Sequence, residues 1–213
     1  MRKLLVLPMV ALLIGAIAAP VSAGANVSNS SQSATTAQGY WGSGGKEDGV
    51  EAYGSLYAWQ DSGSSAAYVE FSEGSGQWVD CTPADDTDDF YGFQGQSRYG
   101  SGDGTLKVGK GSSDAHASAT LEIYSYVIDD CAGTYEETSE DGVLVSLDLV
   151  ANGPKMMERG TGSFKIPSQF NSHSSYSTTS RSAAGAATIG DGPAIAVDGG
   201  IGTVSWRDHS NGG

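Results

Sequence analysis

The sequence is poor in basic residues and lacks the short motifs that mark most active sites. Only 11 lysines and arginines stand against 25 aspartates and glutamates, which gives a net charge of −14. A field of this sign repels phosphate backbones and anionic lipid surfaces, so we expect neither nucleic acid nor an acidic membrane as a partner. Solubility outside the cell is the simplest reason for the acidity, and cation binding is the alternative.

Histidine is also scarce, and no nucleophile motif is present. His116, His173 and His209 are far apart in the sequence and fall within no metal-ligand spacing, so we do not expect a zinc site. No serine lies in a GxSxG turn, and no glycine-rich stretch precedes an expected helix. We therefore assign no catalytic residue from motifs and expect no organic cofactor.

Two cysteines, Cys81 and Cys131, are the complete cysteine content of the chain. In an exported protein an isolated pair predicts one disulfide, whereas a redox or metal-binding pair would follow a tighter spacing. Closing a loop of about 50 residues would stabilise the fold by about 4 kcal/mol.

The first 23 residues have the layout of a secretory signal peptide. Arg2 and Lys3 precede an apolar run over 4–18, and small residues end at Ala23, where we place cleavage. An uncleaved anchor is the alternative, but the run is shorter than the roughly 20 residues that span a bilayer. We expect a small secreted bacterial protein, extracellular and away from the membrane after cleavage.

The rest of the chain divides by composition. Residues 24–38 are small and polar without periodicity, which predicts a disordered leader. Residues 39–208 form a single β-rich domain in this interpretation, followed by a flexible tail over 209–213. The segment 172–187 is low in complexity and is either a flexible loop or a Ser/Thr-rich edge strand.

Alternation of apolar and polar residues indicates half-buried strands over 67–71, 121–127 and 143–149. Glycine-rich segments at 73–76 and 100–104 read as turns between such strands. This spacing predicts an all-β fold, either an antiparallel β-sandwich of jelly-roll type or an open barrel. Further strands are expected over 53–60, 77–81, 89–94, 105–109, 162–166, 186–189, 194–197 and 202–207.

The densest acidic cluster is a candidate metal site. Carboxylates crowded this closely repel one another unless they are solvated or neutralised, so a bound Ca²⁺ is one interpretation and a solvated acidic loop is the other. The spacing does not match an EF-hand. The candidate ligands are Asp80, Asp85, Asp86 and Asp88.

Tyrosines on the polar faces of the expected strands are candidate ligand-binding residues. Tyr68, Tyr124 and Tyr126 offer flat amphipathic rings that could stack on a sugar or anchor a protein. Glu70 and Glu122 lie on the same faces and could form the carboxylate pair of a glycan hydrolase. The alternative for the rings is a core role, which we also expect for Trp78 and Trp206.

These features predict a secreted, non-enzymatic binding or envelope-associated module. Its partner would be a glycan, a cell-envelope component or a protein. A jelly-roll glycan hydrolase using Glu70 and Glu122 is one alternative, and a secreted protease inhibitor is another. Calcium is the one cofactor that the sequence leaves open.

Overall fold

The computed structural model describes residues 27–42, 51–82, 90–166 and 170–212. All elements of regular secondary structure in these ranges are β-strands, so the predicted all-β class is confirmed. The strands are β1 (Val27–Trp41), β2 (Glu51–Asp61), β3 (Ala67–Asp80), β4 (Tyr91–Val108), β5 (Asp114–Asp129), β6 (Thr134–Ala151), β7 (Met156–Ile166), β8 (Phe170–Ile189) and β9 (Ile195–Gly212).

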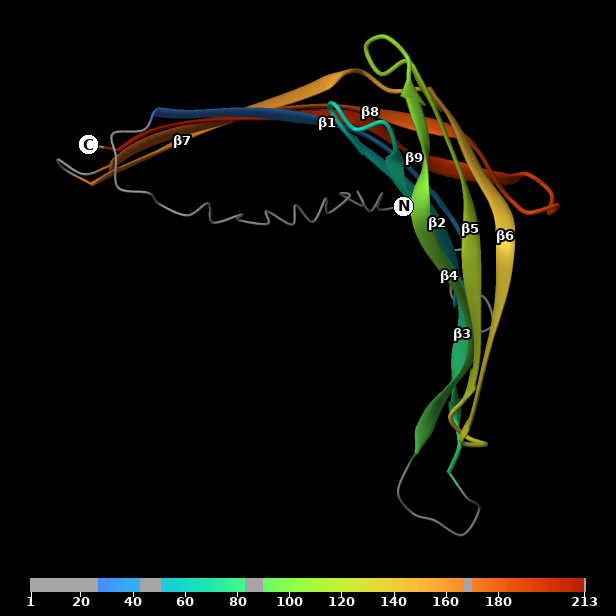
Figure 1. Cartoon of the computed structure of the whole chain (residues 1–213). Helices are drawn as coiled ribbons and strands as arrows, with labels where there is room; N and C mark the ends of the chain where they lie inside the picture. Colours follow the sequence, from blue (N-terminus) through green and yellow to red (C-terminus); the bar gives the residue numbers. More distant parts are fainter. Residues whose placement is uncertain (1–26, 43–50, 83–89, 167–169, 213) are drawn as a thin grey trace, which may run out of the picture.

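The nine strands form one antiparallel sheet that closes on itself (Figure 1). Its order is β6-β5-β4-β3-β2-β1-β9-β8-β7, and β6 also pairs with β8 through residues 145–151 and 183–189. This last pairing closes eight strands into a ring, with β7 attached to β8 alone. The structure is therefore one continuous closing sheet rather than two stacked sheets.

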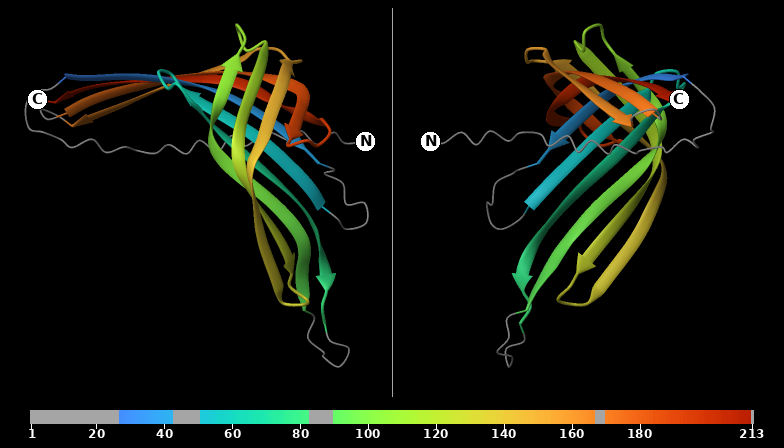
Figure 2. Two further views of the ribbon diagram at one scale, coloured as in Figure 1. Left: turned by 45° about the vertical axis from the view of Figure 1, so that its right-hand side comes forward. Right: turned by 90° about the vertical axis from the view of Figure 1, so that its left-hand side faces the viewer.

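Two arms extend from the ring because many strands are longer than the ring wall (Figures 1 and 2). The β3–β6 arm comprises residues 72–82, 90–100 and 122–142. The β7–β9 arm comprises 27–35, 156–166, 170–182 and 203–212. The side chains of each arm lie either on the inner face, which continues the ring interior, or on the outer face.

The ring interior is lined by small and branched apolar side chains. Alanines such as Ala37, Ala58 and Ala117 are fully buried beside Leu56 and Leu147. A closed ring of eight strands leaves an interior only wide enough for side chains to fill, so alanine is suited to the positions where opposite walls approach.

Phe71 closes one end of this core. Its ring stacks on Trp41 with centroids 6.3 Å apart. The Arg98 guanidinium lies 5.6 Å from the ring centroid on its way to Glu73, which accepts a hydrogen bond from Arg98 at 2.8 Å. An ion pair and two aromatic rings therefore separate the core from the polar inner face of the β3–β6 arm.

The glycine-rich segments predicted to be turns lie inside long strands. A Cβ on Gly54 would come within 2.0 Å of the Trp41 ring, and one on Gly76 within 2.2 Å of the Phe93 ring. Aromatic rings thus lie flat across glycines of neighbouring strands, which compensates for the missing side chain. The expectation of turns at 73–76 and 100–104 is therefore wrong. Aromatic rings cover the glycines of the first segment, whereas those of the second lie against the aliphatic side chains of Ile123, Leu121 and Val69.

The predicted disordered leader and flexible tail are wrong where the structure describes them. Residues 27–38 belong to β1, which pairs with β9 over its whole length from Val27 to Tyr40. Residues 209–212 complete β9. Both segments lack large alternating apolar residues because both faces of the β7–β9 arm are open to solvent. Residues 1–26, with the predicted signal peptide, lie outside the described residues.

The low-complexity segment 172–187 is strand rather than loop. It forms most of β8, which pairs with β9 on one side and with β7 and then β6 on the other. The segment is therefore internal to the sheet, and the edge-strand expectation is wrong. Its serines satisfy their backbone groups through pairing, so no apolar pattern was needed to form the strand.

Candidate binding face

All ten tyrosines occupy outer-face positions. On β3, for example, Val69 and Phe71 are buried in the ring while Tyr68 between them is exposed. A phenol hydroxyl needs a hydrogen-bond partner, which the alanine-lined interior does not offer. The outer positions are Tyr40, Tyr53, Tyr57, Tyr68, Tyr91, Tyr99, Tyr124, Tyr126, Tyr135 and Tyr176.

Strand register gathers most of these rings on one surface over β1–β6. Tyr99 of β4 is directly opposite Tyr124 of β5, and Tyr126 packs against Tyr135 with ring centroids 5.9 Å apart. Rows of residues across the strands run Tyr40–Ser55–Ser72–Tyr99–Tyr124 and Tyr53–Gly74–Ser97–Tyr126–Glu137. We call this surface the tyrosine face, defined by Tyr40, Tyr53, Tyr57, Tyr68, Tyr99, Tyr124, Tyr126 and Tyr135.

Carboxylates hold several of these rings in place. Each pair joins a tyrosine to a glutamate two residues away on the same strand, where alternation puts both on one face. The sequence signal is a tyrosine and a glutamate separated by one residue. The phenol oxygens donate from Tyr68 to Glu70 at 2.9 Å, from Tyr124 to Glu122 at 2.8 Å and from Tyr135 to Glu137 at 3.3 Å.

The same carboxylates keep the phenols neutral. Burial first and then the charge of Glu70 raise the pKa of Tyr57 to about 12. A hydrogen bond with Ser101 lowers the pKa of Tyr68, but burial and hydrogen bonds to Tyr99 and Glu70 outweigh it and raise that pKa to about 12. The hydrogen bond to Glu122 raises the pKa of Tyr124. The tyrosine face therefore presents neutral phenols at physiological pH.

We predict that the fold loses stability in alkaline solution. A pKa raised in the folded state contributes stability below the unfolded value of 10.0, and that contribution disappears as the pH rises through about 12. Urea unfolding followed by circular dichroism should show a falling free energy of unfolding across this window.

The Glu70→Gln variant tests the cause, because it removes the charge beside Tyr57 and Tyr68. Ultraviolet titration of phenolate should then show tyrosines ionising at lower pH than in the wild type. The matched control is Asp191→Asn, which removes an exposed negative charge from the turn between β8 and β9 and should leave the titration curve unchanged. Equal titration curves for wild type and Glu70→Gln would contradict the prediction.

The two glutamates proposed for hydrolysis, Glu70 and Glu122, lie on β3 and β5 with β4 between them. Strands spaced by about 4.8 Å put their backbones roughly 9.5 Å apart. Each carboxylate accepts a hydrogen bond from the hydroxyl of a tyrosine on its own strand. The structure thus brings the predicted carboxylates and tyrosines onto one face.

Neither tryptophan expected in the core is there. Trp78 is 70% exposed at an outer position and meets Phe93 edge to face at 5.7 Å. Trp206 also lies at an outer position and donates from Nε1 to Gln32 at 2.9 Å. Their strands continue beyond the ring into the arms, so the neighbouring apolar residues no longer mark a buried face.

The predicted disulfide between Cys81 and Cys131 is confirmed. It joins the residue after β3 to the turn between β5 and β6, at the end of the β3–β6 arm. Because β4 lies between these strands, the bond ties the two flanking strands of the arm together across their neighbour. It therefore fixes the arm where hydrogen bonding along the strands ends.

Most of the proposed calcium ligands, Asp85, Asp86 and Asp88, lie outside the described residues. Asp80 is described, and its carboxylate accepts a hydrogen bond from the Thr82 backbone at 2.9 Å. Hydrogen bonds from the Thr82 side chain and backbone lower the pKa of Asp80. Within the described ranges, no three metal-ligating side chains converge.

The fold brings together two histidines that are far apart in the sequence. His173 of β8 is directly opposite His209 of β9 on the inner face of the β7–β9 arm. The His209 ring nitrogen Nδ1 hydrogen-bonds to Asn29 Oδ1 of β1. Sequence spacing could not reveal this pair, because it depends on the register between β8 and β9.

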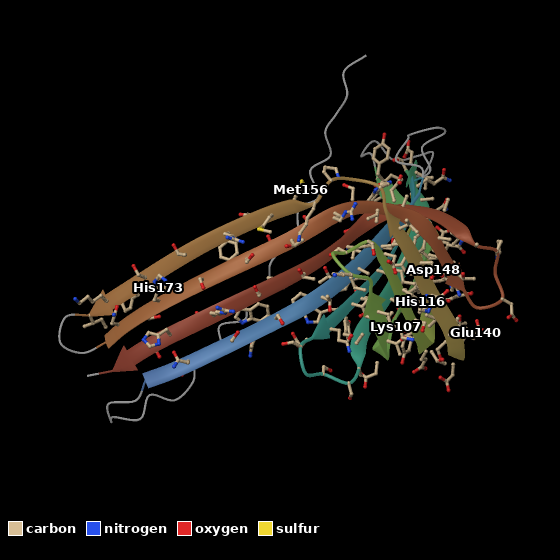
Figure 3. All side chains as sticks on the ribbon, turned by 90° about the horizontal axis from the view of Figure 1, so that it is seen from above. Lys107, His116, Glu140, Asp148, Met156 and His173 are labelled. Carbon is tan, nitrogen blue, oxygen red and sulfur yellow. A yellow bond between two sulfur atoms is a disulfide. The ribbon has the colours of Figure 1, made fainter. Side chains whose placement is uncertain are left out.

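The third histidine is separate. His116 on the ring contacts Asp148 at 2.6 Å, and Lys107 is opposite His116 on β4. Figure 3 shows these three residues on the ring and His173 out on the β7–β9 arm. Both partners of the His116–Asp148 pair are largely exposed, so it is a hydrogen-bonded contact on the surface rather than an enclosed site.

Comparison with known proteins assigns no family. No family model matches this sequence, and no curated protein matches it. The beta domain of the Bordetella autotransporter BrkA is a weak structural neighbour, with 7% identity and a TM-score of 0.15 over 86% of this chain and 98% of that one. Among the described residues, no helix is long and apolar enough to span a membrane.

Proposed function

We propose that this protein is a secreted binding module and that its tyrosine face binds a glycan. The observation that carries the proposal is the set of outer-face rings whose hydroxyls are held by Glu70, Glu122 and Glu137. The face recognises its ligand without chemical conversion. The disulfide supports an extracellular location, because such bonds persist in oxidising compartments.

The face has the two kinds of group that a sugar needs. Tyrosine rings offer apolar surface for the C–H faces of a sugar, while carboxylates and serine hydroxyls offer acceptors and donors for its hydroxyls. Ser72 and Ser101 lie between the tyrosines on β3 and β4. Rings fixed by hydrogen bonds lose little conformational freedom on binding, which favours affinity.

The arrangement of the carboxylates favours binding over hydrolysis. A glycosidase needs one carboxyl group that donates a proton and another that attacks or activates water. Glu70 and Glu122 instead each accept a hydrogen bond from the tyrosine two residues away on the same strand, so the two carboxyl groups have similar surroundings and neither is set apart as acid or nucleophile. Two hydrogen-bond acceptors held in place in this way suit the recognition of hydroxyl groups.

We predict that Tyr99→Ala or Tyr124→Ala weakens retention on a neutral polysaccharide by roughly tenfold each. Affinity electrophoresis of the mature protein against a panel of neutral polysaccharides measures this. The matched control is Tyr176→Ala, which removes an outer tyrosine bonded to a glutamate on the other arm. The same loss in this control would contradict a site on the tyrosine face.

The same incubation separates binding from hydrolysis. We expect retention without release of reducing ends. Release that Glu70→Gln abolishes would replace the proposal with the glycan hydrolase. If no polysaccharide is retained, the tyrosine face is not a glycan-binding site.

A further inference from the structure

The β7–β9 arm sorts its charges by face. Register places every lysine and arginine of this arm at an inner position, and both acidic residues, Glu158 and Asp208, at outer positions. The inner assignment follows from Ala183 and Ile201, which continue the same alternation into the buried ring. The inner basic residues are Arg159, Lys165, Arg181 and Arg207.

Hydrogen-bonding side chains fill most of the rest of this inner face, and Met157 is an apolar exception. A depression of about 320 Å³ opens there, and two residues at outer positions, Ser30 and Asp208, also border it. Its inner-face lining is Asn29, Ser31, His173, Ser175, Arg207 and His209. With the Asn29 oxygen as acceptor, His209 donates from Nδ1, which fixes its ring beside Arg207. The rows across the arm are Asn29–His209–His173–Ser163, Ser31–Arg207–Ser175–Thr161 and Ser33–Ser205–Ser177–Arg159.

The other arm has the opposite composition. Its residues 72–82, 90–100 and 122–142 contain nine acidic side chains and one arginine, Arg98, which is paired with Glu73. The net charge of the chain therefore conceals a separation of charge between the two arms. The repulsion of anions expected from −14 applies to the β3–β6 arm, whereas the inner face of the β7–β9 arm attracts them.

We propose that the inner face of the β7–β9 arm binds a linear anionic polysaccharide. Arg207 and Arg159 contact its carboxylate or sulfate groups, and the serine and threonine rows contact its hydroxyls. Ten residues of strand span roughly 33 Å, which accommodates several sugar units. This surface is distinct from the tyrosine face and independent of it.

The side chains favour a polysaccharide over nucleic acid. Single-stranded nucleic acids are held largely by aromatic rings that stack on the bases. The aromatic residues at this level of the arm, Tyr176 and Trp206, lie on the opposite face. The inner face offers hydroxyl groups instead, which match a sugar polymer that carries acidic groups.

The test measures binding of the mature protein to polygalacturonate, which carries carboxylates, and to dextran sulfate, with neutral dextran and single-stranded DNA in parallel. We expect binding to one or both anionic polysaccharides, weakening as salt rises from roughly 50 to 200 mM. The polymer bound more tightly identifies the anionic group. The double substitution Arg159→Gln and Arg207→Gln should weaken this binding by roughly tenfold or more.

The matched control is Lys107→Gln, which removes an exposed positive charge from the ring. Arg181 is not substituted because it donates to the Gly153 carbonyl at 3.0 Å and supports the fold. Circular dichroism checks folding, and Arg159→Gln alone serves if the double variant does not fold. Tyr99→Ala should leave this binding unchanged, which separates it from the tyrosine face.

Three results would overturn the proposal: no binding to either anionic polysaccharide, an equal loss in Lys107→Gln, or tighter binding to DNA than to both polymers.

Discussion

Replacement of Phe71 by alanine should lower the free energy of unfolding by about 3–5 kcal/mol. Phe71 is fully buried, stacks on Trp41 and lies beneath Arg98. The substitution removes the largest buried side chain of the ring and leaves a cavity that the hydrogen-bonded walls cannot collapse to fill. Urea unfolding followed by circular dichroism measures the change.

Two control variants separate the cavity from a general effect of substitution. Phe71→Leu should cost clearly less, because leucine fills most of the same volume. Tyr91→Ala, at an outer position that is 57% exposed, should change stability by no more than about 0.5 kcal/mol. A loss at Phe71 as small as that at Tyr91 would show that the ring interior is not the main source of stability.

The double substitution Cys81→Ser and Cys131→Ser should cost about 4 kcal/mol in the chain-entropy model. The bond closes a loop with a sequence separation of 50, so its absence gives the unfolded chain much more freedom. Urea unfolding of the double variant beside the wild type measures the loss. The mass of the intact wild type should also be two hydrogens below that of the reduced chain.

Reductant provides the control for this second prediction. Adding it should destabilise the wild type to the level of the double variant and leave the double variant unchanged. The bond lies at the end of the β3–β6 arm, away from the ring, so the folded variant should keep its strand content. Equal stability of wild type and double variant would contradict a stabilising role for the bond.

The ring and the two arms have different roles in the molecule. The ring buries nearly all of the apolar core, whereas both faces of the arms remain open to solvent. The extra strand length therefore adds recognition surface rather than core. The tyrosine face is on the outer surface of β1–β6, and the basic residues are on the inner face of the β7–β9 arm. A module of this kind could bind two different polymers at once.

Sequence alternation located the strands that line the ring. The patterns over 67–71, 121–127 and 143–149 predicted both the strands and their buried faces, because period-two alternation is local and these segments carry large apolar residues inward. The same patterns put Tyr68, Tyr124 and Tyr126 on the outer face. The disulfide followed from having only two cysteines.

Sequence alternation did not predict the strands where the ring interior is narrow or where both faces of an arm are exposed to solvent. The residues of β1 that face the ring interior are Ala37, Gly39 and Trp41, and those of β8 include Ala183 and Ala187. Small residues give no alternation signal, so these strands were interpreted as leader and loop. Glycines beneath aromatic rings were interpreted as turns because the sequence does not show which neighbour covers them.

The sequence by itself therefore determined that the chain forms strands, which face of the large apolar strands is buried, and that Tyr68, Tyr124 and Tyr126 lie on the opposite face. Only the tertiary structure decided that β6 pairs with β8 to close the ring, that His173 meets His209, and that the basic residues of one arm share a face. The physical reason is register. Alternation fixes the side of each residue within one strand, but hydrogen bonding between strands far apart in the sequence fixes which residues become neighbours.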